Sequence, residues 1–189
     1  MYPKTAALLA VLPLMLTGCQ STRVDDIAAK PSKVNTRPSP GLKLNPEDQA
    51  TVDAVWTSYQ KLNTIYIKAA QTGVYNWDPD PAKRPMYDYA AGQFLSALER
   101  DLDFMSEQGI IRTGEPKVTL RRVVSVSATS ILVESCVDDS TTDSIDQTTR
   151  KSVAAPSQNK RYPVTLRAGL YPDGQWRWVE SHPERAASC

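Results

Sequence analysis

The residues that could carry acid–base chemistry are few, because the chain of 189 residues contains a single histidine, His182, close to its C-terminus. Glu134, Asp138 and Tyr66 are the other candidates. An isomerase or cyclase that works in a cavity needs a carboxylate or imidazole whose pKa burial moves toward neutrality, beside a donor that stabilises an enolate. Each candidate also has an ordinary place, on a solvated strand face, in the core or at an exposed chain end. We therefore assign no catalytic residue.

The sequence contains no motif of the other common classes of catalytic, nucleotide or metal site. It contains no Gly-rich phosphate loop, paired-histidine zinc motif, nucleophile elbow or dinucleotide fingerprint. The aspartates of 138–146 do not have the spacing of a calcium loop. With 22 Lys and Arg against 21 Asp and Glu, the chain creates no field that gathers nucleic acid. The sequence predicts no metal, no cofactor and no nucleic-acid partner, and it favours a protein that is not an enzyme.

The first residues of the chain have the order of a secretion signal. Lys4 precedes the apolar run 6–16, which is too short to span a membrane, and Leu16-Thr17-Gly18-Cys19 follows. These four residues resemble the lipobox of bacterial lipoproteins. The resemblance implies cleavage between Gly18 and Cys19 and a diacylglyceryl thioether on Cys19, with acyl chains such as palmitate that anchor the protein in a membrane. A buried helix with an ordinary cysteine is the alternative.

Residues 19–44 are predicted to be a disordered tether between the lipidated cysteine and a folded domain. The stretch 20–44 holds five basic and two acidic residues, three prolines and no aromatic residue, so it cannot bury enough apolar area to fold. We therefore divide the chain into a signal peptide at 1–18, the tether at 19–44 and a single domain at 45–189.

Two helices are expected at the start of this domain. Asn45-Pro46 has the residue types of a helix start, and apolar residues then recur every three or four positions up to a stop at Gly73. The prolines of 74–85 predict a loop. A second apolar stripe predicts a helix from about 86 to 108 that ends at Gly109.

Beyond Pro116 the apolar period changes to two, which predicts strands. Val133 and Val137 should lie on one face of the second strand, with Glu134, Cys136 and Asp138 on the other. Arg121-Arg122 opposite Glu134 suggests a cross-strand ion pair. The polar stretch 139–159 is either a long connection or a weak, exposed hairpin. The expected strands cover 118–126, 130–138, 161–170 and 175–180.

Helices followed by an antiparallel sheet predict an α+β fold, with the helices packed on one face of a curved sheet. Together with this order, Cys-Val-Asp-Asp-Ser at 136–140 and Asp-Gly-x-Trp-x-Trp-Val at 173–179 resemble secreted actinobacterial lipoproteins of the nuclear transport factor 2-like (SnoaL-like) superfamily. The resemblance covers residues 45–185 and implies a cone, in which a bent sheet wraps around helices and leaves a cavity at its open end. The stretch 138–160 is longer and more polar than the hairpin of that fold, which leaves the strand count open.

The three cysteines fit an extracytoplasmic protein. If lipid occupies Cys19, then Cys136 and Cys189 remain, and outside the cytoplasm nothing keeps their thiols reduced. We expect a disulfide between them, with two free thiols as the alternative.

The expected function is that of a lipoprotein anchored to the cell membrane through Cys19, a non-catalytic binding or interaction module of the cell envelope. Its partner would be an unknown envelope protein or a small apolar ligand. A phage- or prophage-encoded exclusion lipoprotein, which confers superinfection immunity, is one variant of this hypothesis. A cavity enzyme of the isomerase or polyketide-cyclase type is the alternative function. The residues expected at a pocket are Tyr66, Glu134, Asp138 and Trp176.

Overall fold

The computed structural model describes residues 41–155 and 159–189. The predicted signal peptide, Cys19 and residues 20–40 of the predicted tether lie outside the described residues. The last residues assigned to the tether are described, and they contact the domain: the amide of Leu42 donates to the carbonyl oxygen of Val123 at 3.3 Å. Leu44 is partly buried against the core.

The first helix, α1 (Pro46–Thr72), has the bounds that its sequence predicts. Asn45 Oδ1 accepts a hydrogen bond from the amide of Asp48 at 2.8 Å, which satisfies one of the free donors of the first turn. Gly73 ends the helix in the left-handed conformation, with φ 68°. No helix in the described ranges 41–155 and 159–189 is long and apolar enough to cross a membrane.

The second helix, α2 (Gly92–Glu107), begins later than predicted, because residues just before it form hydrogen bonds with the last strand of the sheet. The short 3-10 helix η1 (Pro81–Lys83) lies in the loop before it. Trp178 in the last strand donates its amide to Tyr89 and accepts from the amide of Ala91, both at 2.9 Å. Ala91, directly after this bridge, is extended, and the helix starts only beyond it.

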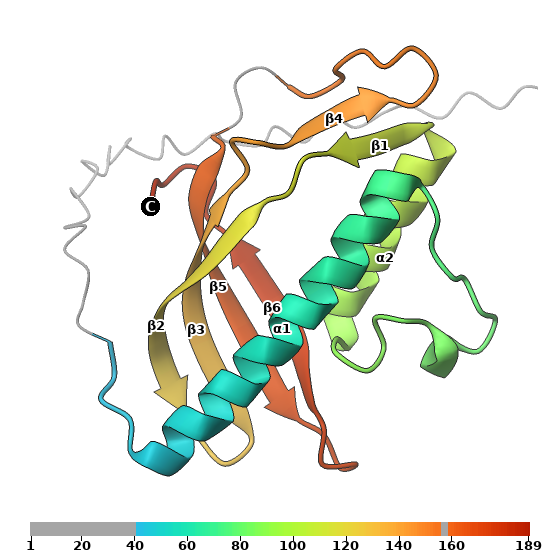
Figure 1. The fold of residues 1–189 in the computed structure, drawn as a ribbon. Helices are drawn as coiled ribbons and strands as arrows, with labels where there is room; N and C mark the ends of the chain where they lie inside the picture. The colour runs from blue at the N-terminus through green and yellow to red at the C-terminus, as the bar shows by residue number, and fades with distance from the viewer. Residues whose placement is uncertain (1–40, 156–158) are drawn as a thin grey trace, which may run out of the picture. The chain divides into compact units, whose positions relative to one another are not determined.

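The main sheet is antiparallel and has the order β2-β3-β5-β6, and its strands agree with the predicted ones to within a few residues. α1 crosses one face of this sheet and α2 lies beside it on the same side (Figure 1). The fold is thus α+β, with helices packed on an antiparallel sheet, as predicted. The strands are β2 (Lys117–Val126), β3 (Ser130–Asp138), β5 (Arg161–Leu170) and β6 (Trp176–Pro183).

A second, two-stranded sheet was not foreseen from the sequence. β1 (Ile110–Thr113) pairs antiparallel with β4 (Asp143–Asp146), which lies inside the stretch expected to be a connection or exposed hairpin. Ile111 and Ile145 face each other in this pair and are both 7% exposed. The pair lies beyond the end of the main sheet, across the C-terminal end of α1 (Figure 1).

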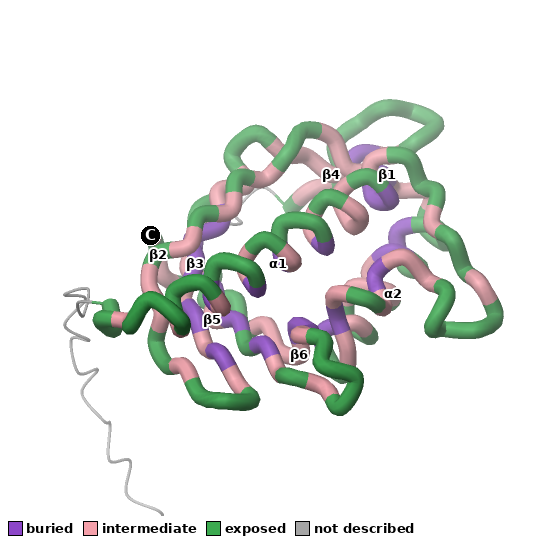
Figure 2. The backbone as a smooth tube through the Cα atoms, turned by 60° about the horizontal axis from the view of Figure 1, so that its bottom comes forward, coloured by how far each residue is buried: buried purple, intermediate pink, exposed green. Residues whose placement is uncertain are grey.

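The core lies between the two helices and the main sheet. Buried positions alternate along β3 and β5 and face the helices (Figure 2). Trp178 is 1% exposed and packs edge-on against Tyr59, with ring centroids 5.2 Å apart. Its indole Nε1 donates to Ser58 Oγ at 3.2 Å, so its polar atom is satisfied inside the core.

The other face of the main sheet carries ion pairs. Arg121 and Arg122 both contact the carboxylate of Glu134, at 3.0 and 2.7 Å, which confirms the predicted cross-strand pair. Arg167 Nε lies 2.9 Å from Glu180 Oε2 on the neighbouring strands. The side chains of β3 therefore divide as predicted, with valines toward the helices and charged residues away from them.

Candidate functional site

A pocket of about 580 Å³ opens where the core meets the two-stranded sheet. α1 and α2 form one wall, the ends of β3, β5 and β6 form another, and β1 and β4 contribute at the rim. This volume lies in the range of sites that hold a small molecule. The pocket therefore lies at an end of the sheet, where the resemblance implied a cavity.

The deeper part of the pocket is apolar. Two apolar residues that line it, Phe104 on α2 and Val153 after β4, are 55% and 49% exposed, so apolar surface also reaches solvent. An apolar wall of this extent suits a hydrocarbon group. The apolar lining includes Leu62, Ile67, Phe94, Leu98, Met105, Ile110, Val118, Val137 and Val164.

One polar cluster of the pocket joins three different elements. Tyr66 on α1 donates its hydroxyl to Asp101 Oδ2 on α2. Arg112 on β1 donates to the same oxygen at 3.1 Å, and its guanidinium carbon lies 5.4 Å from the centre of the Tyr66 ring. The carboxylate of Asp101 therefore ties both helices to the two-stranded sheet.

A second polar cluster is built in the same way from the other wall. Tyr162 on β5 donates its hydroxyl to Asp139 Oδ2 at 2.8 Å. Arg185, beyond the end of β6, reaches the same oxygen at 3.8 Å and stacks on the Tyr162 ring, 4.1 Å from its centroid. Each cluster thus consists of a carboxylate shared by a tyrosine and an arginine.

The tyrosines of both clusters keep their protons at neutral pH. Burial raises the pKa of Tyr66 well above its ordinary value, Arg112 opposes this effect, and Asp101 adds to it. Burial and the hydrogen bond to Asp139 likewise raise the pKa of Tyr162. Both phenols therefore serve as hydrogen-bond donors rather than as bases.

Arg112 keeps its charge although it is largely enclosed. Burial disfavours the charged form, but the acidic groups around it, Tyr66 and Asp101 first, outweigh burial, so its pKa lies above the ordinary value. Asp139 in the other cluster acts in the same direction. The two clusters therefore interact electrostatically across the pocket.

A third cation, Lys160, lines the pocket beside the second cluster. Its Nζ donates to the carbonyl oxygen of Thr142 at 3.2 Å, and its own carbonyl accepts from the amide of Asp139 at 2.6 Å. No carboxylate among residues 41–155 and 159–189 lies within ion-pair distance of this ammonium group. Lys160 therefore brings to the pocket a positive charge that has no carboxylate partner of its own among the described residues.

Of the four residues predicted to lie at a pocket, Tyr66 lines this one, and the structure corrects the other three. Glu134 and Asp138 point away from the helices, because side chains alternate along β3. Hydrogen bonding with the Ser140 side chain, and then with its amide, which donates to Asp138 at 3.0 Å, lowers the pKa of the carboxyl. Trp176 begins β6, whereas that strand meets the pocket at its other end.

His182 lies outside the pocket as well. It pairs in register with Thr165 on the charged face of the sheet, and its side chain is 68% exposed. Its Nε2 lies 3.6 Å from Glu180 Oε2. The one imidazole of the chain therefore has no access to a ligand in this pocket.

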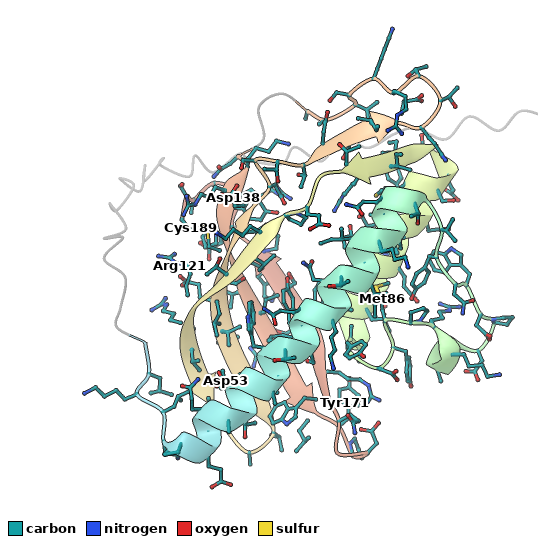
Figure 3. The ribbon with its side chains drawn as sticks, viewed as in Figure 1. Asp53, Met86, Arg121, Asp138, Tyr171 and Cys189 are labelled. Carbon is teal, nitrogen blue, oxygen red and sulfur yellow. A yellow bond between two sulfur atoms is a disulfide. The ribbon has the colours of Figure 1, made fainter. Side chains whose placement is uncertain are left out.

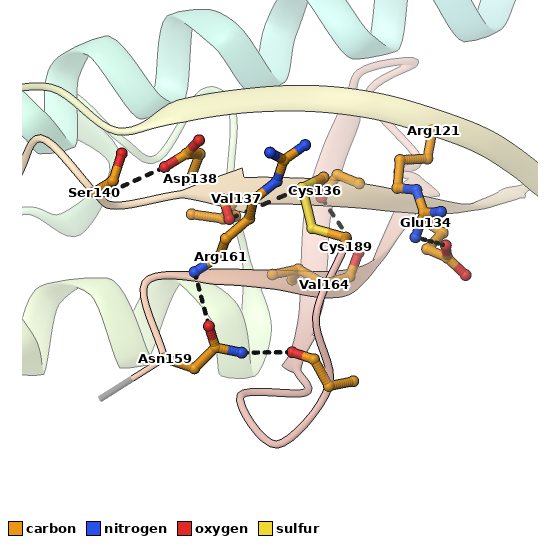
Figure 4. The surroundings of a disulfide bond; sticks show 12 residues. Arg121, Glu134, Cys136, Val137, Asp138, Ser140, Asn159, Arg161, Val164 and Cys189 are labelled. Atoms are coloured by element: carbon orange, nitrogen blue, oxygen red, sulfur yellow. Dashed lines mark hydrogen bonds and ion pairs between the residues drawn. A yellow bond between two sulfur atoms is a disulfide. The ribbon is translucent and has the colours of Figure 1, made fainter. Parts of the chain in front are cut away.

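The structure contains the disulfide between Cys136 and Cys189 (Figure 4). It lies on the charged face of the sheet, and Figure 3 shows Cys189 near Asp138 and Arg121, on the side of β2 and β3 that faces away from α1. Asn159 Nδ2 also donates to the carbonyl oxygen of Ala187 at 2.7 Å. The end of the chain is thereby fixed beside the strand ends that line the pocket.

Four charged residues of the two clusters were not singled out from the sequence: Asp101, Arg112, Asp139 and Arg185. In the sequence, Asp101 lies among charged residues that are typical of the solvent-exposed face of a helix. Asp139 belongs to an acidic run that is typical of a solvated loop. They meet only because helices, strands and the C-terminal segment converge on one cavity. Among the residues that the structure describes, no three histidine, cysteine or acidic side chains come together as metal ligands.

Comparison with known proteins gives neither a family nor a close relative. No family model matches the chain, and no curated protein matches it. The intermembrane space region of the chloroplast protein ARC6 is similar in structure, with a TM-score of 0.46 and 12% identity over 76% of this chain and 99% of that one.

Two further solved structures are similar. A nuclear transport factor 2-like superfamily protein from Salmonella enterica serovar Typhimurium has a TM-score of 0.43 and 10% identity, over 72% of this chain and 94% of that one. A protein from Catenulispora acidiphila has a TM-score of 0.39 and 13% identity, over 72% and 95%. We therefore infer the function of the protein from its own pocket.

Proposed function

We propose that this protein is a lipid-anchored, extracytoplasmic binding module whose pocket holds a small, largely apolar molecule. The observation that supports the proposal most is the pocket of about 580 Å³, whose lining combines apolar side chains with two clusters of hydrogen-bonding groups. Sites for small molecules commonly combine apolar walls with a few fixed polar groups. The hydrocarbon part of the ligand then lies against α1 and α2, and its polar part meets the two clusters.

Binding fits the polar groups better than catalysis does. Two of the pocket carboxylates, Asp101 and Asp139, each accept a tyrosine hydroxyl and face an arginine. These partners are arranged to fix the orientation of a ligand, as donors and acceptors of set position do in binding sites. His182, the chain's one imidazole, is on the opposite face of the sheet. A cavity enzyme remains the second candidate because Tyr66 lines the pocket, and its hydroxyl would have to leave Asp101 before it could donate to a carbonyl oxygen of a substrate.

The anchor is a separate part of the proposal and rests on the N-terminal sequence. Leu16-Thr17-Gly18-Cys19 follows a charged residue and an apolar run in the order of a lipoprotein signal. The acylated Cys19 would hold the domain at the outer side of the cell membrane. An exclusion lipoprotein of phage origin is a variant that draws only on the small size and the long tether.

The binding proposal is tested with Nile red, a neutral dye that fluoresces in apolar surroundings. The full chain carrying Cys19→Ser, which lacks the acylation site and needs no detergent, is titrated with the dye. We expect saturable binding that Leu98→Arg abolishes, because a guanidinium in the apolar wall fills and charges the pocket. The control is Val124→Arg, since Val124 is 42% exposed on β2 and does not line the pocket. Absence of saturable binding, or equal loss in both variants, would contradict the proposal.

The anchor is tested by mass spectrometry of membrane fractions. Wild-type protein should carry a diacylglyceryl group at Cys19. The Cys19→Ala protein should carry no acyl group. A Cys19→Ala protein that remains acylated refutes this part of the proposal and leaves the pocket untouched. For the enzyme alternative, turnover of a bound carbonyl compound that Tyr66→Phe abolishes would replace the binding function with a catalytic one.

A further inference from the structure

The charged groups of the pocket offer more hydrogen-bond donors than their protein partners use. The two arginines, Arg112 and Arg185, each have several N–H groups. The contacts with carboxylates described above use one nitrogen of each, and that of Arg185 is a long contact of 3.8 Å. Both tyrosine hydroxyls already donate to carboxylates. A ligand that meets this rim therefore has to supply acceptors.

The charges at the second cluster also favour a ligand that supplies acceptors. Asp139 is the carboxylate that Arg185 and Tyr162 share, and Lys160 adds a further positive charge beside it. The backbone amide of Asp139 donates to the carbonyl of Lys160, which fixes the two residues as neighbours. Asp143, the third carboxylate of the lining, accepts a hydrogen bond from Ser152 Oγ at 2.9 Å. Asp143 balances the charge of the lining as a whole, but at the second cluster two cations, Lys160 and Arg185, face the one carboxylate of Asp139. One singly charged anion would balance this local excess.

The geometry of the donors favours a planar anion. A guanidinium group presents parallel N–H groups that match the two oxygens of a carboxylate. Stacking on Tyr162 holds the plane of Arg185 at a fixed place at the rim. Leu62, Phe94 and Leu98 line the same pocket and form an apolar wall along which a hydrocarbon chain can lie.

We propose that the pocket takes a single-chain amphiphile with a carboxylate head group, held at the rim by Lys160 and Arg185 with its chain along the apolar wall. This inference rests on the proposed binding function and names its ligand class. Lys160 supplies a point charge and Arg185 supplies paired N–H donors. Arg112, on the opposite rim, adds long-range attraction for the head group.

The test compares three molecules that share one alkyl chain: decanoate, decanol and decylammonium. Each is titrated by calorimetry, below its micellar concentration, into the full chain carrying Cys19→Ser. We expect decanoate to bind at least about tenfold more tightly than the other two, the effect of one charge-assisted hydrogen bond. Lys160→Gln should weaken decanoate by about tenfold and leave decanol unchanged, while Lys61→Gln, an exposed change on α1, should alter neither.

The outcomes separate the inference from the function on which it rests. If all three molecules bind with similar affinity, or decylammonium binds best, the pocket binds hydrocarbon chains but the carboxylate assignment is wrong. If decanoate is preferred but Lys160→Gln and Arg185→Gln both leave its affinity unchanged, the assigned residues are wrong. If none of the three binds and Nile red does not bind either, the binding function itself fails.

Discussion

The guanidinium carbon of Arg185 lies 4.1 Å from the centroid of the Tyr162 ring, which makes the last residues of the chain part of the pocket wall. The disulfide between Cys189 and Cys136 fixes the nearby chain end on the opposite face of the sheet. The C-terminal segment therefore wraps around the edge of the sheet. One end of it is covalently tied, and the other end contributes to the pocket.

Removal of the disulfide should lower both stability and ligand affinity. The bond closes a loop with a sequence separation of 53 residues. On the chain-entropy model, loss of such a loop costs about 4 kcal/mol of the free energy of unfolding. The Cys136→Ser/Cys189→Ser variant should show this loss in urea unfolding, and weaker Nile red binding at low urea because Arg185 is less well held. Wild-type protein under reducing conditions should behave like the variant, and a variant with unchanged stability would contradict the argument.

Gly114 lies at the corner between β1 and β2 and should tolerate no side chain. It has φ 72°, and a Cβ there would collide with the carbonyl oxygen of Thr141. Gly109 has φ 62°, but no atom lies within 4 Å of the place that a Cβ would take, so it is a matched control. Gly109→Ala should cost about 1 kcal/mol, which is the cost of the left-handed conformation. Gly114→Ala should cost more than about 3 kcal/mol, because the backbone has to move; similar losses in urea unfolding would contradict this interpretation.

Local signals were sufficient for the parts of the fold that depend on neighbouring residues. Asn45 and Gly73 bound α1 as predicted because cap chemistry acts within one turn. The alternation along β3 placed Glu134, Cys136 and Asp138 on one face, since side-chain direction follows directly from the period of a strand. These predictions needed no knowledge of the rest of the chain.

Contacts between distant segments explain what the sequence did not reveal. The pairing of Ile111 with Ile145 joins two short strands, neither of which has a pattern long enough to identify it. Residues near Ala90 have helical spacing, but Tyr89 and Ala91 form hydrogen bonds to Trp178, and the helix begins only at Gly92. The pocket residues come from several elements, and among them only Tyr66 was predicted to lie at a pocket. Proximity in the fold, rather than spacing in the chain, defines this site.

The hydroxyl of Tyr66 should contribute to stability through its hydrogen bond to Asp101. Tyr66→Phe removes the donor and leaves Arg112 as the partner of the carboxylate. Loss of a hydrogen bond to a charged group costs about 1.5–3 kcal/mol. Tyr87→Phe is the control, because the Tyr87 hydroxyl makes no hydrogen bond among the residues of 41–155 and 159–189, and its ring still stacks with Arg177. Thermal unfolding of both variants checks this, and equal stabilities would show that the Tyr66 hydroxyl contributes nothing.

Tyr75 should make the protein less stable in alkali. Burial, and then the charge of Glu99, raises the pKa of Tyr75 from 10.0 to about 12. Between these values the unfolded chain has lost the phenolic proton while the folded chain keeps it, so the free energy of unfolding falls as pH rises. Below pH 10 both states hold the proton, and stability does not depend on this group.

Tyr75→Phe therefore makes the fall of stability with pH less steep in this window. The buried phenols Tyr59, Tyr66 and Tyr162, whose pKa values are also raised, maintain a remaining fall of the same sign. Urea unfolding at a series of alkaline pH values measures the slope, and the ultraviolet absorbance of the phenolate follows the titration directly. If Tyr75→Phe and the wild type lose stability in parallel, then Tyr75 ionises in the folded protein as it does in the unfolded chain, and the burial argument for this side chain fails.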